Sequence, residues 1–250
     1  TKSMIETFSF PFPKLEEQKA IAKILSDLDA KIELNQKMNK TLEDIGQAIF
    51  KHWFIDFEFP NAKGEPYKSS GGEMVFNEEL EKEIPKEWEV VELKDTLSLL
   101  KDGSHNPPKR VEKGIKFIAG ASNLKHFSID FSKCSFIKEE DYTSFHKKWL
   151  IKEDDILYTI VGTVGNIAIV RASDLPFSMQ RSIAILRSNE KLNQFYLYFY
   201  LSNKYFDSEV KSKLNPTAQP GIYLGEIGII LVTVPDKKVL DKFAEIAQNI

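Results

Sequence analysis

The chain has 250 residues, a formal net charge of −3 and 42% hydrophobic residues, which suits one large domain or a medium domain with an extended element. Its one cysteine, Cys134, excludes a disulfide framework or a cysteine metal cluster within one copy and is expected to be a small buried hydrophobe. We expect a cytoplasmic protein without membrane contact, because the sequence has no signal-peptide pattern and no apolar run of transmembrane length. A weak net charge does not by itself indicate a nucleic-acid partner.

The first predicted elements are a short strand and a long helix. Residues 5–13 alternate, with Phe8, Phe10 and Phe12 on one face, and stop at Pro13. The following stretch, 14–55, contains no proline and only one glycine, and it carries acidic residues in its first turns, where the helix dipole favours them. At 1.5 Å per residue this helix would be roughly 60 Å long, which predicts a spacer rather than an ordinary core helix.

Apolar residues recur along this helix at the seven-residue spacing of coiled coils, so we predict that it packs against another long helix. The predicted partner interface, called the helix seam below, consists of Ile21, Leu28, Asn35, Met38, Leu42, Ile45, Ile49 and Trp53, widened by Ile24, Leu25 and Ile32. Asn35 has two open interpretations. It is either a locally solvated residue or a polar residue that fixes the register of the partner helix at some cost in stability.

The rest of the chain divides into a linker, a mixed domain and a second helix start. Proline, glycine and serine in residues 59–84 predict a polar linker after the helical segment 1–58. Residues 85–235 contain short strand-like runs and one aromatic-rich helix and predict an α+β fold: a mixed α/β domain joined to a long coiled-coil-forming helix. The expected strands and helix are 116–119, 135–138, 156–161, 166–170 and 194–202.

The end of the chain repeats its beginning. Residues 231–235 alternate and stop at Pro235, as residues 8–13 do at Pro13. When the prolines are aligned, apolar residues of 236–250 fall on apolar residues of the long helix. Because the pattern of strand, proline and apolar helix recurs, we predict that a second heptad helix starts at 236–250.

Three motifs resemble parts of catalytic motifs, but each lacks a residue that the chemistry would need. Asn106-Pro107-Pro108 resembles part of an amino-methyltransferase motif, but Lys109 stands where an aromatic residue would stack on a flipped base. Residues 162–165 lack the Gly-Lys-Ser/Thr of a phosphate-binding loop and are typical of a tight turn between strands. Residues 153–155 have no Glu-x-Lys on the next strand, so we interpret them as a charged turn rather than a nuclease site. No catalytic residue is predicted.

Metal binding is also not predicted, because the four histidines, His52, His105, His126 and His146, show no ligand spacing.

The loop from Lys101 to Lys113 is more suggestive, since it combines short hydrogen-bonding side chains with cations and two stiffening prolines. Duplex DNA is read by such groups, with cations on phosphates and hydrogen-bonding groups on base edges. The predicted DNA contacts are Ser104, His105, Asn106, Gln180, Arg181 and Gln219 for bases and Lys109, Arg110, Lys147 and Lys148 for phosphates. A solvated loop would have a similar composition, so each residue could equally serve a local structural role.

Taken together, the residues resemble a known family. The segment Pro13–Glu33 is similar to the conserved helical region of type I restriction–modification specificity (S) subunits. The following unit resembles their target recognition domains through an ordered set of pieces: Asp102–His105, Gly114–Ile118, Asp154–Leu157, Gly162–Gly165 and Gln219–Ile222.

This resemblance implies a non-catalytic subunit that recognises double-stranded DNA and docks the methyltransferase (modification) subunit. It implies that S-adenosylmethionine, ATP and Mg are bound by partner subunits, including a restriction subunit where the system has one, and not by this chain. Family members usually carry two recognition domains, each reading half of a split target, and two long antiparallel helices. This chain holds one of each, so it is either a fragment or a half-subunit that could form a homodimer through the helix seam.

Two other functions stay open from the residues alone. One is the DNA-recognition part of a fused methyltransferase or nuclease, and the other is a coiled-coil adaptor that does not bind DNA.

Overall fold

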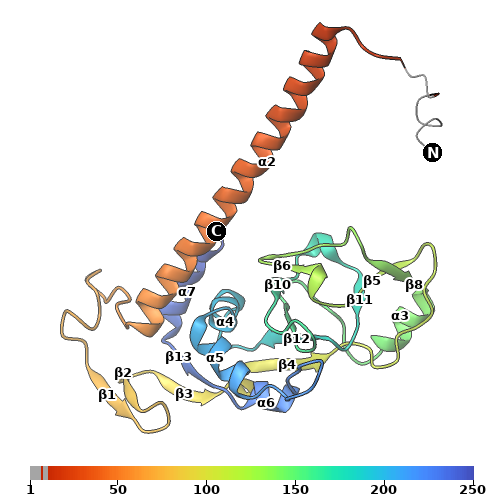
Figure 1. Cartoon of the computed structure of the whole chain (residues 1–250). Helices are drawn as coiled ribbons and strands as arrows, with labels where there is room; N and C mark the ends of the chain where they lie inside the picture. Colours follow the sequence, from red (N-terminus) through yellow and green to blue (C-terminus); the bar gives the residue numbers. More distant parts are fainter. Residues whose placement is uncertain (1–6, 8–10) are drawn as a thin grey trace. The chain divides into compact units, whose positions relative to one another are not determined.

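The computed structural model describes Thr7 and residues 11–250 (Figure 1). The strand predicted over residues 5–13 falls mostly on residues 1–6 and 8–10, which lie outside the described residues, so it stays a prediction. The chain forms two compact units, residues 1–45 with Ile250 and residues 46–249.

The predicted long helix is present as α2 (Leu15–Phe50), 36 residues long, with Glu16 and Glu17 in its first turn. The backbone N–H of Lys14 donates to Glu17 Oε2 at 3.0 Å, which caps the start of the helix. Apolar side chains of the seam remain open to solvent: Ile21, Leu28, Met38 and Ile45 are 46–55% exposed. The seam residue Asn35 is exposed as well, whereas Leu42, Ile49 and Trp53 are half-buried.

The α-helix ends five residues before the predicted end at Ile55, because the chain widens into a π-helix, η1 (Lys51–Ile55). The N–H of Asp56 donates to Lys51 O at 2.9 Å, five residues back. The Lys51 ammonium also bonds both Asp56 carboxylate oxygens, at 2.7 and 2.8 Å. This ion pair spans the wide turn. Apolar periodicity does not distinguish a final π turn from an α turn, which is why the sequence did not predict it.

Residues 46–249 contain many short strands. They are β1 (Met74–Asn77), β2 (Lys82–Pro85), β3 (Glu89–Glu92), β4 (Leu97–Asp102), β5 (Ile115–Ile118), β6 (Leu124–Lys125), β7 (Ser128–Ile129), β8 (Ser135–Ile137), β9 (Ile156–Thr159), β10 (Ile167–Ile169), β11 (Phe177–Met179), β12 (Ile183–Ser188) and β13 (Leu231–Val234). Among the described residues, one antiparallel sheet has the order β10-β9-β12-β4, and a second has the order β11-β5-β8 with β11 and β5 parallel. The pairs β1-β2, β13-β3 and β6-β7 form separate ribbons.

The remaining helical elements are α3 (Glu139–Phe145), α4 (Gln194–Leu201), α5 (Lys204–Ser212), α6 (Leu224–Gly228), α7 (Lys237–Ala247) and the 3₁₀ turns η2 (Leu93–Thr96), η3 (Ala121–Asn123) and η4 (Ala172–Asp174). The predicted strands correspond to β5, β8, β9, β10 and β13, and the aromatic-rich helix corresponds to α4. Helix α7 lies in the segment 236–250, where the repeat predicted a helix. The sequence did not predict the hairpin β1-β2, which lies in the expected linker 59–84 and includes the buried Ile84.

The core of residues 46–249 has an aliphatic part and an aromatic part. The aliphatic part surrounds Leu157, Met179 and Ile185 between the two larger sheets, and the half-buried Cys134 packs against it. The aromatic part joins Phe50 and Phe54 to Tyr196 of α4 and Phe243 of α7. Helix α4 contacts both the four-stranded sheet and α7 (Figure 1). The protein therefore has the predicted α+β class, a mixed domain together with a long helix.

Candidate nucleic-acid interface

The loop after β4 is held directly against the loop after β11. The N–H of Ser104 donates to Met179 O at 2.9 Å, and the N–H of Arg181 donates to Ser104 O at 3.1 Å. Gly103 permits this approach, because a Cβ atom there would lie 2.3 Å from Met179 O. The structure thus places Ser104, His105 and Asn106 beside Gln180 and Arg181, which lie far from them in the sequence.

Two further loops are joined to this pair of loops by backbone hydrogen bonds. The N–H of Ile160 donates to Ser182 O at 2.9 Å, and the N–H of Gly162 donates to Pro220 O at 2.8 Å. Gly162 and Gly165 have φ values of 81° and 104°, as expected for the turn that joins β9 to β10. These bonds bring the exposed Gln219 to the same turn. We call residues 103–106, 160–165, 180–182 and 217–220 the recognition rim.

His105 is a polar side chain of the rim that contacts a carboxylate. Its Nε2 lies 2.6 Å from Oδ2 of Asp102, the last residue of β4. The side chain of His105 is 64% exposed, whereas that of Asp102 is 20% exposed. Asp102 belongs to the family-like segment Asp102–His105 but was not predicted as a site residue. Its spacing of three residues from His105 was the available signal.

Beneath the rim lies a small cavity lined by Asp102, Ser104, His105, His146 and Ser178, among others. Among the described residues no partner bonds Ser104 Oγ, which is buried, so base contact by this hydroxyl stays a prediction. His146, whose neighbours in the sequence are Phe145 and Lys147, is buried and bonds Ser178 Oγ at 3.0 Å. Burial lowers the pKa of His146, and the Trp149 carbonyl acts in the opposite direction.

The predicted phosphate contacts lie outside the rim and in two places. Lys109 and Arg110 follow the rim residues in the chain, and both are exposed. The Arg110 guanidinium lies 4.1 Å from the centre of the Phe117 ring and donates to Pro108 O at 2.9 Å, so it also orders its own loop. Partial burial lowers the pKa of Arg110. Lys147 and Lys148 are exposed and follow His146 at the cavity.

The acidic segment 153–155 forms a structural ion pair. Asp155 is fully buried and accepts from Arg187 Nε and Nη2 at 2.6 and 2.8 Å and from the Lys152 N–H at 2.8 Å. Burial and the Glu153 and Asp155 carboxylates raise the pKa of Asp154, which has a φ of 67° in the turn before β9. The Asp155 carboxylate, directly before β9, is therefore paired with the Arg187 guanidinium.

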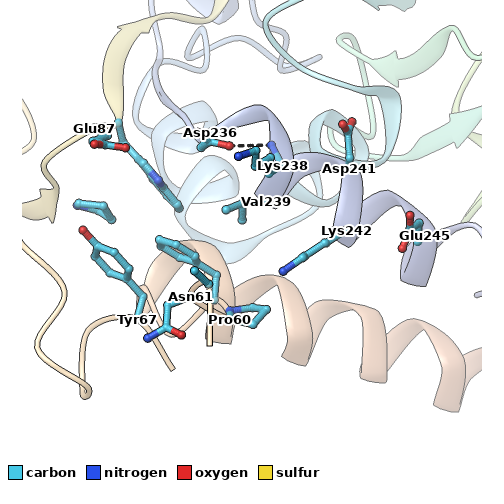
Figure 2. A pocket seen from close by; sticks show the side chains of 14 residues that line it. Pro60, Asn61, Tyr67, Glu87, Asp236, Lys238, Val239, Asp241, Lys242 and Glu245 are labelled. Carbon is cyan, nitrogen blue, oxygen red and sulfur yellow. Dashed lines mark hydrogen bonds between the residues drawn. The ribbon is translucent and has the colours of Figure 1, made fainter. Parts of the chain in front are cut away.

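Residues 59–67 and α7 enclose a separate groove of about 540 Å³ (Figure 2). The Phe59 ring stacks there on the rings of Tyr67 and Trp88, with distances between ring centres of 4.6 and 5.1 Å. Asp236 caps α7 by accepting from the Lys238 N–H at 2.7 Å, as Figure 2 shows. None of the predicted DNA contacts lines this groove.

Within the part of the chain that the structure describes, no cluster of three or more His, Cys, Asp or Glu side chains could hold a metal ion. Helices with the length and apolarity to span a bilayer are likewise absent from the described residues.

Comparison with known proteins decides the family. The model of the type I restriction modification DNA specificity domain matches residues 1–44 and 85–249. The chain belongs to this family. The family resemblance seen in the sequence is thereby confirmed.

Two type I restriction enzyme specificity subunits of Methanocaldococcus jannaschii are among its relatives. The MjaIX subunit is 31% identical over 249 residues, covering 98% of this chain and 54% of the relative. The MjaVIII subunit is 29% identical over 254 residues, covering 100% of this chain and 56% of the relative. The chain thus spans about half the length of these relatives.

A solved structure supports the fold. A chain from a type I R-M system structure matches with a TM-score of 0.50 and 18% identity, over 96% of this chain and 53% of that chain.

Proposed function

We propose that this chain is the DNA recognition subunit of a type I restriction–modification complex, where it reads one half of a bipartite target and docks the modification subunit. Membership in the specificity-domain family supports the proposal. The observation that carries it for this chain is the recognition rim, in which backbone hydrogen bonds join loops that are distant in sequence and carry hydrogen-bonding side chains. The exposed Lys109 and Arg110 follow residues 103–106 in the chain, and the exposed Lys147 and Lys148 follow His146 at the cavity.

In this proposal the chain itself is not catalytic and acts in the cytoplasm. S-adenosylmethionine, ATP and Mg belong to the modification and restriction subunits. Residues 1–58 act as spacer, 85–235 as recognition domain and 236–250 as the start of a second helix. A methyl-transfer assay with labelled S-adenosylmethionine tests this division, since methylation of DNA by the chain alone would overturn it.

The rim residues should determine sequence preference. Replacing Gln180 and Arg181 by alanine should weaken specific DNA binding. The expected loss is about 1–3 kcal/mol for each side chain that makes two hydrogen bonds to one base. Binding to random duplex should change much less. Sequence selection by the assembled complex, followed by titration of selected and random duplexes, gives both values. An equal weakening on both duplexes would assign these side chains to the phosphates instead.

The lysines near the cavity should act on all sequences alike. Lys147→Ala with Lys148→Ala should weaken specific and random binding together and reduce the salt dependence of binding by about one to two released counterions. Binding measured between low and moderate salt tests this. The matched control is Lys237→Ala with Lys238→Ala in α7, which should leave the salt slope unchanged. An unchanged slope in the Lys147/Lys148 variant would remove both residues from the interface.

We further propose that the helix seam binds a second long helix, either of another copy or of another subunit. Exposed Ile24, Leu28 and Ile32 leave an apolar stripe that association would bury. The isolated chain is therefore expected to form dimers, and changing Leu28 and Ile32 to glutamate should give monomers. Sedimentation equilibrium measures the mass. Glu33→Gln on the exposed Glu33–Lys37 pair is the control. A wild-type chain that stays monomeric at high concentration would argue against the homodimer.

A further inference from the structure

The contact between Asp102 and His105 fixes how one ring of the recognition rim is presented. Asp102 belongs to β4, which pairs with the central strand β12, so its carboxylate is attached to the sheet. The adjoining loop is held by the Ser104 N–H bond to Met179 O. The backbone that carries His105 is thus held in place, while the His105 side chain is 64% exposed.

The carboxylate also selects the tautomer of the ring. A carboxylate only accepts hydrogen bonds, so the nitrogen that faces it at 2.6 Å, His105 Nε2, carries the hydrogen. In a neutral imidazole the other nitrogen is then an acceptor. In that neutral form His105 Nδ1 is a hydrogen-bond acceptor, held next to the loop that carries Gln180 and Arg181.

We propose that Nδ1 of His105 accepts a hydrogen bond from an exocyclic amino group in the major groove, N6 of adenine or N4 of cytosine, and that Asp102 is the positioning residue for this contact. Adenine and cytosine offer amino donors there, whereas guanine and thymine offer O6 and O4 acceptors, which would oppose the Nδ1 lone pair. Binding should therefore depend on the amino group of one adenine or cytosine, on whichever strand faces His105. This inference rests on the proposed DNA-recognition function.

Sequence selection with the full chain assembled with its modification subunit tests the proposal through matched variants. His105→Ala should abolish the preference at one position and keep it at the others. His105→Asn should retain it, because an asparagine amide oxygen can occupy the place of Nδ1. Asp102→Asn should weaken it, since an amide can also donate to the ring and shift the hydrogen to Nδ1. His52→Ala, at an exposed histidine of η1, should behave as wild type.

Base analogues that lack the major-groove amino group identify the donor. Exchanging adenine for 2-aminopurine, or cytosine for 2-pyrimidinone, removes the major-groove amino group at the affected position. Wild-type affinity should then fall roughly tenfold, as for the removal of one hydrogen bond, and His105→Ala should show no further decrease. The two replacements, made separately, distinguish adenine from cytosine.

The outcomes separate this inference from the function on which it rests. A wild-type complex that selects a sequence, together with an unchanged preference in His105→Ala, overturns the His105 contact and leaves the function standing. An affinity that neither amino-group replacement lowers would also overturn it, because His105 would then accept no hydrogen bond from such a group. A wild-type complex that selects no sequence overturns both. Equal thermal unfolding of wild type and His105→Ala excludes misfolding as the cause.

Discussion

Asp155→Ala is expected to lower the free energy of unfolding by about 3–5 kcal/mol, because it leaves the partly buried Arg187 cation without its partner. Asp155 is fully buried, and its two carboxylate oxygens accept three hydrogen bonds, two from Arg187 and one from the Lys152 N–H. Removing the carboxylate breaks all three. Urea unfolding followed by circular dichroism measures the change.

A double variant separates the effect of the ion pair from the effect of side-chain shape. Asp155→Leu combined with Arg187→Met removes both charges and should be clearly less destabilising than the sum of the single changes. The exposed pair Asp207–Lys211 is the control, and Asp207→Ala should stay within about 0.5 kcal/mol of wild type. Additive effects of the two core changes would show that Asp155 and Arg187 are not coupled.

This ion pair also illustrates what the sequence could not predict. Residues 153–155 were interpreted as a charged turn, and the structure confirms a turn there, directly before the buried strand β9. The partner of Asp155 lies 32 residues later in the chain. Pairing of β12 with β9 places Leu186 opposite Ile156, and this register brings Arg187 to Asp155. Register is a property of two distant strands and leaves no local signal in either one.

Local signals were sufficient for elements that depend on their own residues. Seven-residue periodicity without proline predicted α2, and alternation ending at Pro235 predicted β13. The π turn after Phe50 was missed because apolar periodicity does not distinguish a final π turn from a final α turn. The hairpin β1-β2 was missed because its segment is rich in polar and turn residues, which dominate the composition of both linkers and hairpins.

The candidate site was predicted in part for the same reason. Side-chain chemistry pointed to Ser104, His105 and Asn106 and, separately, to Gln180, Arg181 and Gln219. Their adjacency follows from the strand order β10-β9-β12-β4 and from backbone bonds between loops, which only the folded chain contains. Whether these residues contact bases stays a prediction, to be tested by sequence selection.

Removal of a single aromatic ring at the end of the long helix should have an effect of similar size. Phe54→Ala is expected to cost about 3–5 kcal/mol of unfolding free energy, as large-to-small changes at buried phenylalanines do. The Phe54 side chain is 1% exposed, and its ring centre lies 4.8 Å from that of Tyr196 and 5.0 Å from that of Phe243. The cavity left by its removal would be shared by η1, α4 and α7.

The neighbouring Ile55 provides the control, because it belongs to the same π turn but is 36% exposed. Ile55→Ala should therefore cost much less than Phe54→Ala. Phe54→Leu, which refills part of the volume, should fall between them. Thermal or urea unfolding of the three variants tests this order. If η1 were held mainly by its backbone and by the Lys51–Asp56 pair, Phe54 and Ile55 would matter equally. Unequal destabilisation instead means that aromatic packing joins the end of the long helix to the mixed domain.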